Sequence, residues 1–184
     1  MKKVIIFAVA LICSVVVFAQ EKSKQYSLKA INAGLGVPME FRDLHAAGLD
    51  IHLGYDCAYP LNDQLAIGFY VNGTGGFIGE LANTTQDVDK FHTMIKVSTG
   101  LMLEIGDLAQ RPYLVGVAPC TGIGYYDMDL VLPIEIRFGR FITDNLYVMG
   151  ELTYGISLAK ETACLEPAIR IGYNFRNDKR SHKK

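Results

Sequence analysis

The stretch LEPAIRIGYNF, residues 165–175, strictly alternates two kinds of side chain. A repeat of two residues is the periodicity of a β-strand, whose successive side chains point to opposite faces. One face is mostly large and apolar and the other is polar or small: Leu165, Pro167, Ile169, Ile171, Tyr173 and Phe175 oppose Glu166, Ala168, Arg170, Gly172 and Asn174. If the apolar face points inward, this is a soluble β protein. If it points outward, the solvent on that side is lipid.

The same alternation recurs along nearly the whole chain. No segment of comparable length shows the period of a helix, and no low-complexity linker indicates a second domain. Turn-rich breaks separate eight alternating segments, at residues 26–37, 48–60, 64–73, 91–105, 112–125, 130–142, 145–158 and 165–175.

The connections between these segments alternate in length, with one exception. The link YDMD, between the fifth and sixth segments, is short where the pattern requires a long one. Alternating short and long loops are typical of an up-and-down barrel with two unlike ends. The short turns lie at 61–64, 106–111 and 143–145, and the longer loops at 38–47, 73–90 and 159–164.

The composition of the polar face indicates which face meets lipid. This face is rich in small residues, among them Ala66, Gly68, Gly116, Ala118, Gly122 and Gly124. Glycine weakens a strand and gains nothing on a wet surface, whereas inside a narrow barrel small residues leave room for a few long ones. The charges on this face are sparse and nearly balanced, as an enclosed space requires. We therefore expect the apolar face to point outward.

These observations together predict an all-β fold, an eight-stranded antiparallel up-and-down transmembrane β-barrel. A closed sheet pairs its backbone groups without water and is one of two structures that can span a membrane. Pro119 falls in the middle of a segment, where a closed sheet has no free edge, so we expect either a bulge or a different strand boundary there. An aromatic girdle is expected from tyrosines near strand ends, namely Tyr26, Tyr55, Tyr59, Tyr113, Tyr125, Tyr147 and Tyr173.

The N-terminus predicts export. Residues 1–19 combine Lys2 and Lys3, an apolar run and Ala19 before Gln20, the pattern of a cleaved signal peptide. The alternative is a membrane anchor, but the apolar run of about 15 residues is short for a spanning helix of about 20. Residues 20–175 then form one barrel domain, and residues 176–184 form a basic tail.

The charge and the cysteines exclude two further classes. The whole chain has a net charge of −1, and since its first lysines and its tail are basic, residues 20–175 carry −7. An acidic body argues against a nucleic-acid partner. Three cysteines follow the signal, Cys57, Cys120 and Cys164. An odd number in an exported chain leaves at least one unpaired, so the chain is not expected to be a disulfide scaffold. The sequence does not decide how they pair.

Over residues 26–175, the pattern of alternating strands resembles the small eight-stranded outer-membrane barrels of the OmpA/OmpX type. The segment AIRIGYNF, with Ile169, Ile171, Tyr173 and Phe175, resembles the last strand of that family, which the barrel-assembly machinery reads; it departs from the pattern because nine residues follow Phe175. The resemblance implies outer-membrane lipid and the barrel-assembly machinery as partners. The loop at 73–90 is expected to face an extracellular partner.

The charges on the polar face are the candidate site. In terms of the family, they resemble the ion-pair network that fills the interior of small barrels. The alternative is a substrate path or gate. The set comprises Lys96, Glu135, Arg137, Glu151, Glu166 and Arg170.

Catalytic and metal-binding arrangements are weakly supported. His52 and His92 point inward, yet neither has a sequence-evident nucleophile beside it, although Ser98 exists. Asp50, His52 and Asp56 share one face of a strand, but no Cys/His spacing resembles a zinc site. The glycine-rich stretches NGTGGFIG and TGIGYY lack the features of a phosphate loop and are interpreted as a loop and a strand interior. We therefore predict no catalytic residues, no cofactor and no metal.

The sequence predicts a non-enzymatic integral outer-membrane protein with a structural or surface-interaction role. One alternative is a soluble lipocalin-like carrier of apolar ligands, with the two faces reversed. A small outer-membrane channel and a lipid-modifying enzyme are the others.

Overall fold

The computed structural model describes residues 27–40, 46–80, 91–126, 129–158 and 163–175, and these form ten β-strands in a single sheet. The strands are β1 (Leu28–Gly36), β2 (Met39–Glu40), β3 (Ala46–Pro60), β4 (Leu65–Glu80), β5 (Phe91–Ile105), β6 (Tyr113–Pro119), β7 (Gly122–Tyr126), β8 (Asp129–Phe141), β9 (Leu146–Ser157) and β10 (Ala163–Asn174). No helix in the described part of the chain is long and apolar enough to cross a membrane.

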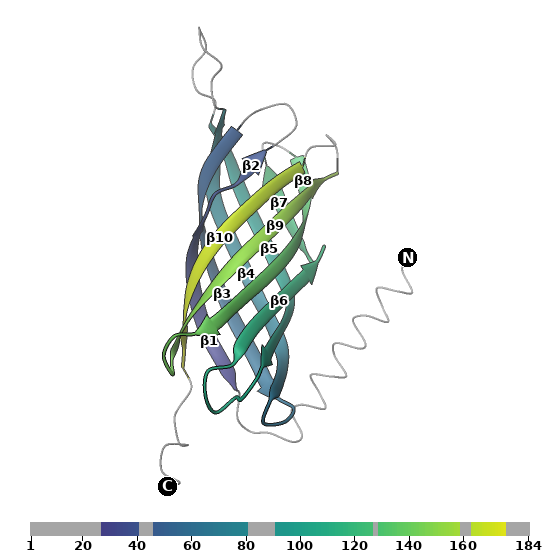
Figure 1. The fold of residues 1–184 in the computed structure, drawn as a ribbon. Coiled ribbons are helices and arrows are strands. Elements are labelled where there is room, and N and C mark those ends of the chain that lie inside the picture. The colour runs from purple at the N-terminus through teal and green to yellow at the C-terminus, as the bar shows by residue number, and fades with distance from the viewer. Residues whose placement is uncertain (1–26, 41–45, 81–90, 127–128, 159–162, 176–184) are drawn as a thin grey trace, which may run out of the picture.

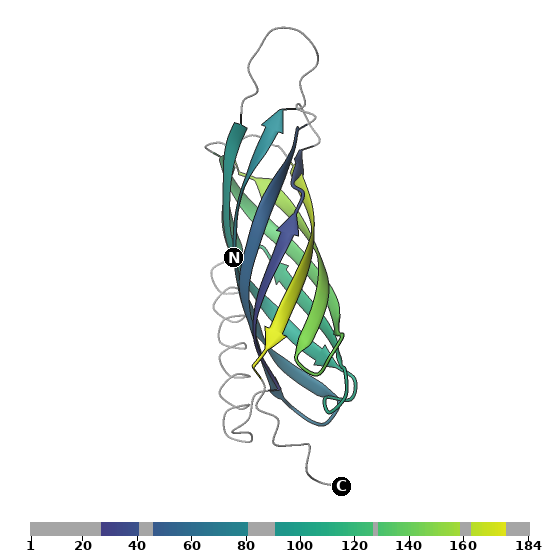
Figure 2. The same ribbon diagram turned by 90° about the vertical axis from the view of Figure 1, so that its left-hand side faces the viewer.

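The ten strands make eight passes around a closed antiparallel barrel (Figure 1). The strands β1 and β2 both pair with β3 and β10, and β6 and β7 both pair with β5 and β8, so each of these two pairs forms one pass. The barrel closes where β1 pairs with β10, whose yellow ribbon runs beside it in Figure 2. The predicted eight-stranded up-and-down barrel is confirmed.

The alternation of side chains along each strand gives the two faces that the sequence predicts. Alternate residues of each strand are buried, as in the pattern of β9 from Leu146 onward. The outward side chains are large and exposed, with Ile169 at 67% and Leu53 at 63%. Such a surface is unfavourable in water and suits hydrocarbon.

Pro119 marks an interruption, as expected. The strand β6 ends there, Cys120 has a φ of 57°, and β7 begins at Gly122. Across the interruption Thr99 N donates to the Thr121 carbonyl at 2.9 Å, so β5 stays paired on both sides. A residue in the left-handed region together with a proline is a local device that lets a closed sheet accommodate an irregular step.

The predicted loop at 73–90 is wrong in its first part. Residues 73–80 belong to β4 and pair with both β3 and β5, for example Gly76 with Asp50 and with Met94. The glycine-rich NGTGGFIG, residues 72–79, therefore lies entirely within β4. Glycine is needed at Gly76 because a Cβ there would collide with the backbone and side chain of Asp50. Residues 81–90 lie outside the described residues. TGIGYY lies mostly in β7, as interpreted.

Other boundaries differ by a few residues. The predicted loop 38–47 contributes Met39–Glu40 to β2 and its last two residues to β3, and β10 begins at Ala163. Residues 41–45 of that loop and residues 159–162 lie outside the described residues. Such shifts at strand ends are ordinary, since end residues carry weaker periodic signals.

The predicted aromatic girdle is only partly correct. Tyr113 and Tyr173 are exposed on the outer face, and Tyr55 is half-buried there. The predicted place of Tyr147 in the girdle is wrong, because this side chain is fully buried inside the barrel. Tyr59 is also buried, in a small cluster with Cys57. Tyr26 and the side chain of Tyr125 lie outside the described part.

The three predicted short turns lie at one end of the barrel, together with the start of β1 and the end of β10 (Figure 1). At 61–64 and 142–145 the chain closes with backbone hydrogen bonds, Leu61 N to Leu65 O and Ile142 N to Leu146 O, each of 2.8 Å. We call this the turn end and the opposite one the loop end. Cys57 and Cys164 are buried, and Cys120 is exposed.

Candidate functional site in the barrel interior

The interior is arranged in layers along the barrel. Charged side chains fill its middle, and apolar side chains pack on both sides of them. Near the loop end the apolar residues are Ile78, Met94 and Cys164. Toward the turn end they are Leu28, Ala30, Ala58, Ala66, Tyr70, Met102, Leu108, Leu114, Ala118, Phe141, Tyr147 and Met149. Leu108 comes from the turn at 106–111 and is only 2% exposed, so this turn covers the end of the barrel.

Strand periodicity and register place the charged residues in the middle layer. Arg137 on β8 lies directly opposite Glu151 on β9, and Glu151 lies opposite Ala168 on β10. Because Ala168 is small, Glu166 and Arg170 on either side of it can extend into the lumen. All six predicted site residues are buried, with Glu135, Arg137, Glu166 and Arg170 at 0% exposure.

Glu151 is the centre of this network. Its Oε2 lies 2.8 Å from Arg137 Nε and 2.6 Å from Arg170 Nε, so one carboxylate forms ion pairs with two guanidinium groups. Arg137 also pairs with Glu135 Oε2 at 3.2 Å and lies 3.5 Å over the ring of Tyr70. Removing one partner from a buried pair leaves an uncompensated charge, which is strongly destabilising.

Lys96 reaches the same layer from β5, across the barrel. Its Nζ lies 2.7 Å from Glu166 Oε1 and 3.6 Å from Glu135 Oε1, and it donates to Thr153 Oγ1 at 3.2 Å. Ser98 Oγ donates to Glu135 Oε1 at 2.6 Å. Lys96 thus joins the acidic side chains of β8 and β10, which are not neighbours of β5 in the sheet.

Sequence reasoning missed the neutral members of the network. Tyr147 OH and Asn32 Nδ2 both donate to Asp56 Oδ2, the second at 2.7 Å, and Asn32 Oδ1 accepts from Arg170 Nη1. Tyr70 OH donates to Glu135 Oε2 at 3.0 Å. The one sequence feature that could have indicated the buried tyrosines is the set of glycines on the polar face, which leave space for large side chains.

Glycines leave the space that these tyrosines occupy. A Cβ at Gly172 would collide with the ring of Tyr147, and one at Gly100 would collide with the ring of Tyr70. The small inner residues therefore accommodate large ones on neighbouring strands, as the sequence predicted in general terms.

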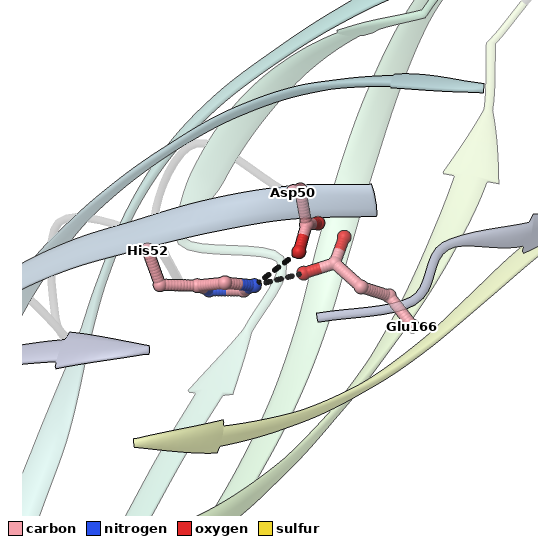
Figure 3. A group of neighbouring side chains, drawn as sticks. All are labelled: Asp50, His52 and Glu166. Atoms are coloured by element: carbon pink, nitrogen blue, oxygen red, sulfur yellow. Dashed lines mark hydrogen bonds and ion pairs between the residues drawn. The ribbon is translucent and has the colours of Figure 1, made fainter. Parts of the chain in front are cut away.

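His52 is the residue of greatest chemical interest, and its partners differ from the predicted cluster. Figure 3 shows its ring directed at Asp50 and Glu166, with Nε2 2.9 Å from Asp50 Oδ1 and 3.2 Å from Glu166 Oε1. Asp56, the predicted third member, instead contacts Asn32 and Tyr147. His92 lies on β5, but its side chain is outside the described part.

The Asp50, His52 and Glu166 donor atoms lie within 4.8 Å of one another, close enough to hold a metal ion. Their surroundings disfavour one. Arg170 Nη2 lies 2.7 Å from His52 Nδ1, and because a guanidinium can only donate, Nδ1 is the acceptor and the ring proton sits on Nε2. This proton occupies the position that a metal would need. Lys96 already pairs with the Glu166 oxygen that would be a ligand.

The arrangement is equally unlike a nucleophilic centre. Ser98 donates to Glu135, and the hydroxyl beside His52 belongs to Thr74, 3.2 Å from Nδ1. Within the described residues no serine or cysteine pairs with His52. A general base must reach the proton that it removes. Here His52, Thr74 and Ser98 are all buried inside the barrel.

The interior is more acidic than the sequence suggested. Among the described residues, fully buried carboxylates outnumber permanent cations by six to three. The carboxylates are Asp50, Asp56, Glu104, Glu135, Glu151 and Glu166, and the cations are Lys96, Arg137 and Arg170. Lys96, Arg137 and Arg170 form their shortest ion pairs with Glu135, Glu151 and Glu166. In the described part of the chain, Asp50 Oδ2 has no hydrogen-bond partner.

Comparison with known proteins rests on structure, since no protein-family model and no curated protein sequence matches the chain. The Ail attachment invasion locus protein of Yersinia pestis, solved with the heparin analogue sucrose octasulfate, superposes with a TM-score of 0.54 at 14% identity over 80% of this chain and 97% of its own. Neisserial surface protein A superposes with a TM-score of 0.53 at 13% identity over 80% of this chain and 97% of its own.

The fold is that of a small outer-membrane β-barrel. A third such barrel, the outer membrane enzyme PagL, superposes with a TM-score of 0.53 at 9% identity over 78% of this chain and 99% of its own. All three identities are low, so the likeness of this chain to these proteins is one of fold alone. Its interior must be interpreted from its own residues.

Proposed function

We propose that the chain is a non-enzymatic integral outer-membrane protein whose closed barrel has a structural or surface-interaction role. One observation carries the proposal: the barrel exposes its large apolar side chains and buries its ionisable ones. Ile136 is 57% exposed while its neighbours Glu135 and Arg137 are 0% exposed. In water this would reverse the normal distribution of side chains; in a bilayer it is the expected one.

The filled interior argues against a channel. An ion crossing the lumen would have to displace paired charges such as Arg137 with Glu151, and then pass apolar layers that include Leu108 and Met94. Eight strands enclose a space just wide enough for side chains. We therefore expect no persistent conductance.

A soluble lipocalin-like carrier is also disfavoured. Such a carrier requires an apolar cavity, with the polar face in water. Here the middle of the interior holds Lys96, Arg137 and Arg170 with their carboxylates, and the apolar side chains Ile169 and Leu53 point outward.

A lipid-modifying enzyme remains the second candidate because PagL is an outer membrane enzyme with the same fold. The described residues give it little support. His52 and Ser98 are buried and belong to different parts of the network, so a lipid on the outer face does not reach them.

Surface interaction would involve residues 81–90, which join β4 and β5 at the loop end. Their sequence LANTTQDVDK has two acids and one lysine. The Ail structure contains a sulfated heparin analogue, but an acidic segment would repel such a polyanion. A neutral or basic partner suits it better.

Export and assembly complete the proposal. Residues 1–19 would be removed as a signal peptide, leaving the barrel of 20–175 and the basic tail of 176–184. The outward residues Ile169, Ile171, Tyr173 and Phe175 of the last pass, all exposed, would be read by the barrel-assembly machinery. Outer-membrane lipid would surround the apolar face.

The test combines fractionation with conductance. The exported protein should be recovered in the outer-membrane fraction, need detergent to stay monodisperse, and migrate faster on a gel unheated than boiled. In planar bilayers it should give no sustained current. Monodisperse protein without detergent would contradict membrane residence, and persistent open-channel currents would make it a porin.

A further inference from the structure

A pocket of about 560 Å³ opens at the turn end, outside the charged interior. It lies between two turns, the one at 106–111 and the one at 142–145, which contributes Asp144. Its other lining residues come from the ends of β5, β6 and β8. Its volume is in the range of small-molecule sites. The lining includes Ile105, Asp107, Arg111, Tyr113, Arg140 and Asp144.

Arg140 occupies an unusual position in this pocket. It is exposed on an outward position of β8, where the other outward residues nearby are apolar, such as Phe138 and Ile142. An arginine that faces lipid is strongly unfavourable at the bilayer midplane, and this penalty nearly vanishes close to the interface. Its position therefore suits the level of the lipid headgroups.

The surroundings of Arg140 hold it at that level. Its guanidinium carbon lies 5.0 Å from the centre of the Tyr113 ring, and this ring stacks on Phe138 at 5.8 Å. Tyr113 and Arg140 are directly opposite each other in the β6–β8 register. Tyrosine at a membrane interface presents a ring to the apolar side and a hydroxyl to water. Tyr113 and Arg140 thus form one side of the pocket, which carries a positive charge and lies between the apolar band and the turns.

The pocket also carries negative charge. Asp107 and Asp144 line it together with Arg111 and Arg140, so its formal charge is balanced. Asp107 Oδ1 accepts from Ala109 N at 2.9 Å, which fixes the turn. A site with two cations and two carboxylates, beside the apolar side chain of Ile105, complements a ligand that has a phosphate, a cationic group and a hydrocarbon part.

We infer that this pocket binds the headgroup of a zwitterionic phospholipid with a primary amine, of the phosphatidylethanolamine type. Arg140 and Arg111 take the phosphate, which guanidinium groups bind well, and Asp144 and Asp107 take the ammonium. Ile105 and Tyr113 contact the upper part of the acyl chains. This inference rests on the proposed membrane location, since the lipid must come from the leaflet at the turn end.

An anionic phospholipid is the competing ligand of similar size. It would bring a phosphate without an ammonium, and the two carboxylates would then face its headgroup without a partner. A choline headgroup keeps the positive charge but cannot donate hydrogen bonds. The three lipids therefore separate recognition of the phosphate from recognition of the amine.

The experiment is native mass spectrometry of the folded, detergent-solubilised protein, titrated with phosphatidylethanolamine, phosphatidylcholine or phosphatidylglycerol. We expect phosphatidylethanolamine to bind at least fivefold more tightly than the other two. Arg140→Gln should weaken its binding about tenfold, the effect of losing one charge-assisted hydrogen bond of about 1.4 kcal/mol. Asp144→Asn should remove most of the preference over phosphatidylcholine.

Lys29→Gln is the matched control, because Lys29 is an exposed cation at the turn end on β1, which lies several strands away from the pocket. It should leave binding unchanged. Soluble phosphoethanolamine is included to separate the headgroup from the membrane-borne lipid, and it should compete only weakly because it lacks acyl chains.

Equal binding of the three lipids, or equal losses for Arg140→Gln and Lys29→Gln, would overturn the inference. Tighter binding of phosphatidylglycerol would overturn it in favour of a purely anionic site. The unheated gel mobility of each variant reports folding. A protein that stays monodisperse without detergent would refute the membrane location itself, a result distinct from failure of lipid selectivity.

Discussion

Replacing Glu151 by glutamine removes the carboxylate that pairs with two buried arginines. Arg137 keeps Glu135 at 3.2 Å and Asp56 at 3.7 Å as carboxylate partners. Arg170 keeps only neutral contacts among the described residues, to Asn32 and to His52. Breaking a buried pair from one side costs about 3–5 kcal/mol, and we expect Glu151→Gln to lower the free energy of unfolding by this amount.

Asp50→Asn is the matched control, because it also neutralises one fully buried carboxylate. Asp50 contacts the neutral His52 ring through Oδ1, and an asparagine oxygen can still accept that hydrogen bond. Its Oδ2 has no hydrogen-bond partner among the residues that the structure describes. Since buried carboxylates outnumber cations in the described interior, this change should cost less than about 1 kcal/mol.

A second substitution tests whether pairing is the cause. Arg170→Met in the Glu151→Gln background removes the cation left without a carboxylate and should recover about 2–3 kcal/mol, measured as a coupling energy in a double-mutant cycle. Exchanging the charges of Arg170 and Glu151 should not restore stability, because Arg137 would then face a second arginine at position 151.

The assay is urea unfolding of the protein in lipid vesicles, followed by unheated gel mobility and by circular dichroism. The chain has no tryptophan, so fluorescence is a poor probe. Equal destabilisation by Glu151→Gln and Asp50→Asn would refute the reasoning, because the loss would then follow from net charge and not from specific pairs.

Three further predictions concern the same barrel. Tyr147→Phe removes the hydroxyl that donates to Asp56 and should cost about 1.5–3 kcal/mol in the same urea assay, whereas an unchanged midpoint would show that this bond contributes nothing. Gly172→Ala should lower the free energy of unfolding by about 1–3 kcal/mol, because its Cβ would meet the Tyr147 ring. Gly150→Ala is the control and should be neutral, since Gly150 lies on the outer face with open space around it. Similar effects of the two changes would contradict the packing described for Tyr147. Protease added to intact cells should cut within 81–90 and spare 176–184, and cleavage of the tail would reverse the proposed orientation.

The fold could be predicted from the sequence because a closed barrel makes the period-2 pattern span almost every residue. The alternation of side chains along a strand assigns Glu135 and Arg137 to the interior, independently of how the strands are paired. The prediction was wrong where it did not follow this alternation. Tyr147 was placed in the girdle because it lies near a strand end, although it alternates with the outward Leu146 and Val148.

The loop at 73–90 was overextended for a related reason. Glycine signals both loops and places of close approach within strands, and residues 73–80 contain four glycines in a strand that pairs on both sides. The sequence offers no local means to separate these two uses.

The partners within the site could not be predicted. Lys96 meets Glu166, seventy residues away, only because the barrel closes and brings β5 and β10 to face each other across the lumen. The choice of Glu166 over Asp56 as a neighbour of His52 depends likewise on the stagger between strands. Periodicity specifies a face, whereas the identity of a contact across the lumen requires the three-dimensional register.

The central claim, that the apolar face of the barrel meets lipid, is tested most directly by spin labels on that face. Single labels are placed at Ile136 and Leu152, which are outward and opposite each other in the β8–β9 register, and at the inward Thr153, with the native cysteines replaced by alanine. In vesicles, the labels at Ile136 and Leu152 should collide with oxygen, which concentrates in hydrocarbon, and not with a water-soluble nickel complex. The label at Thr153 should collide with neither. Access of the nickel complex to Ile136 and Leu152 would place the apolar face in water and contradict the account.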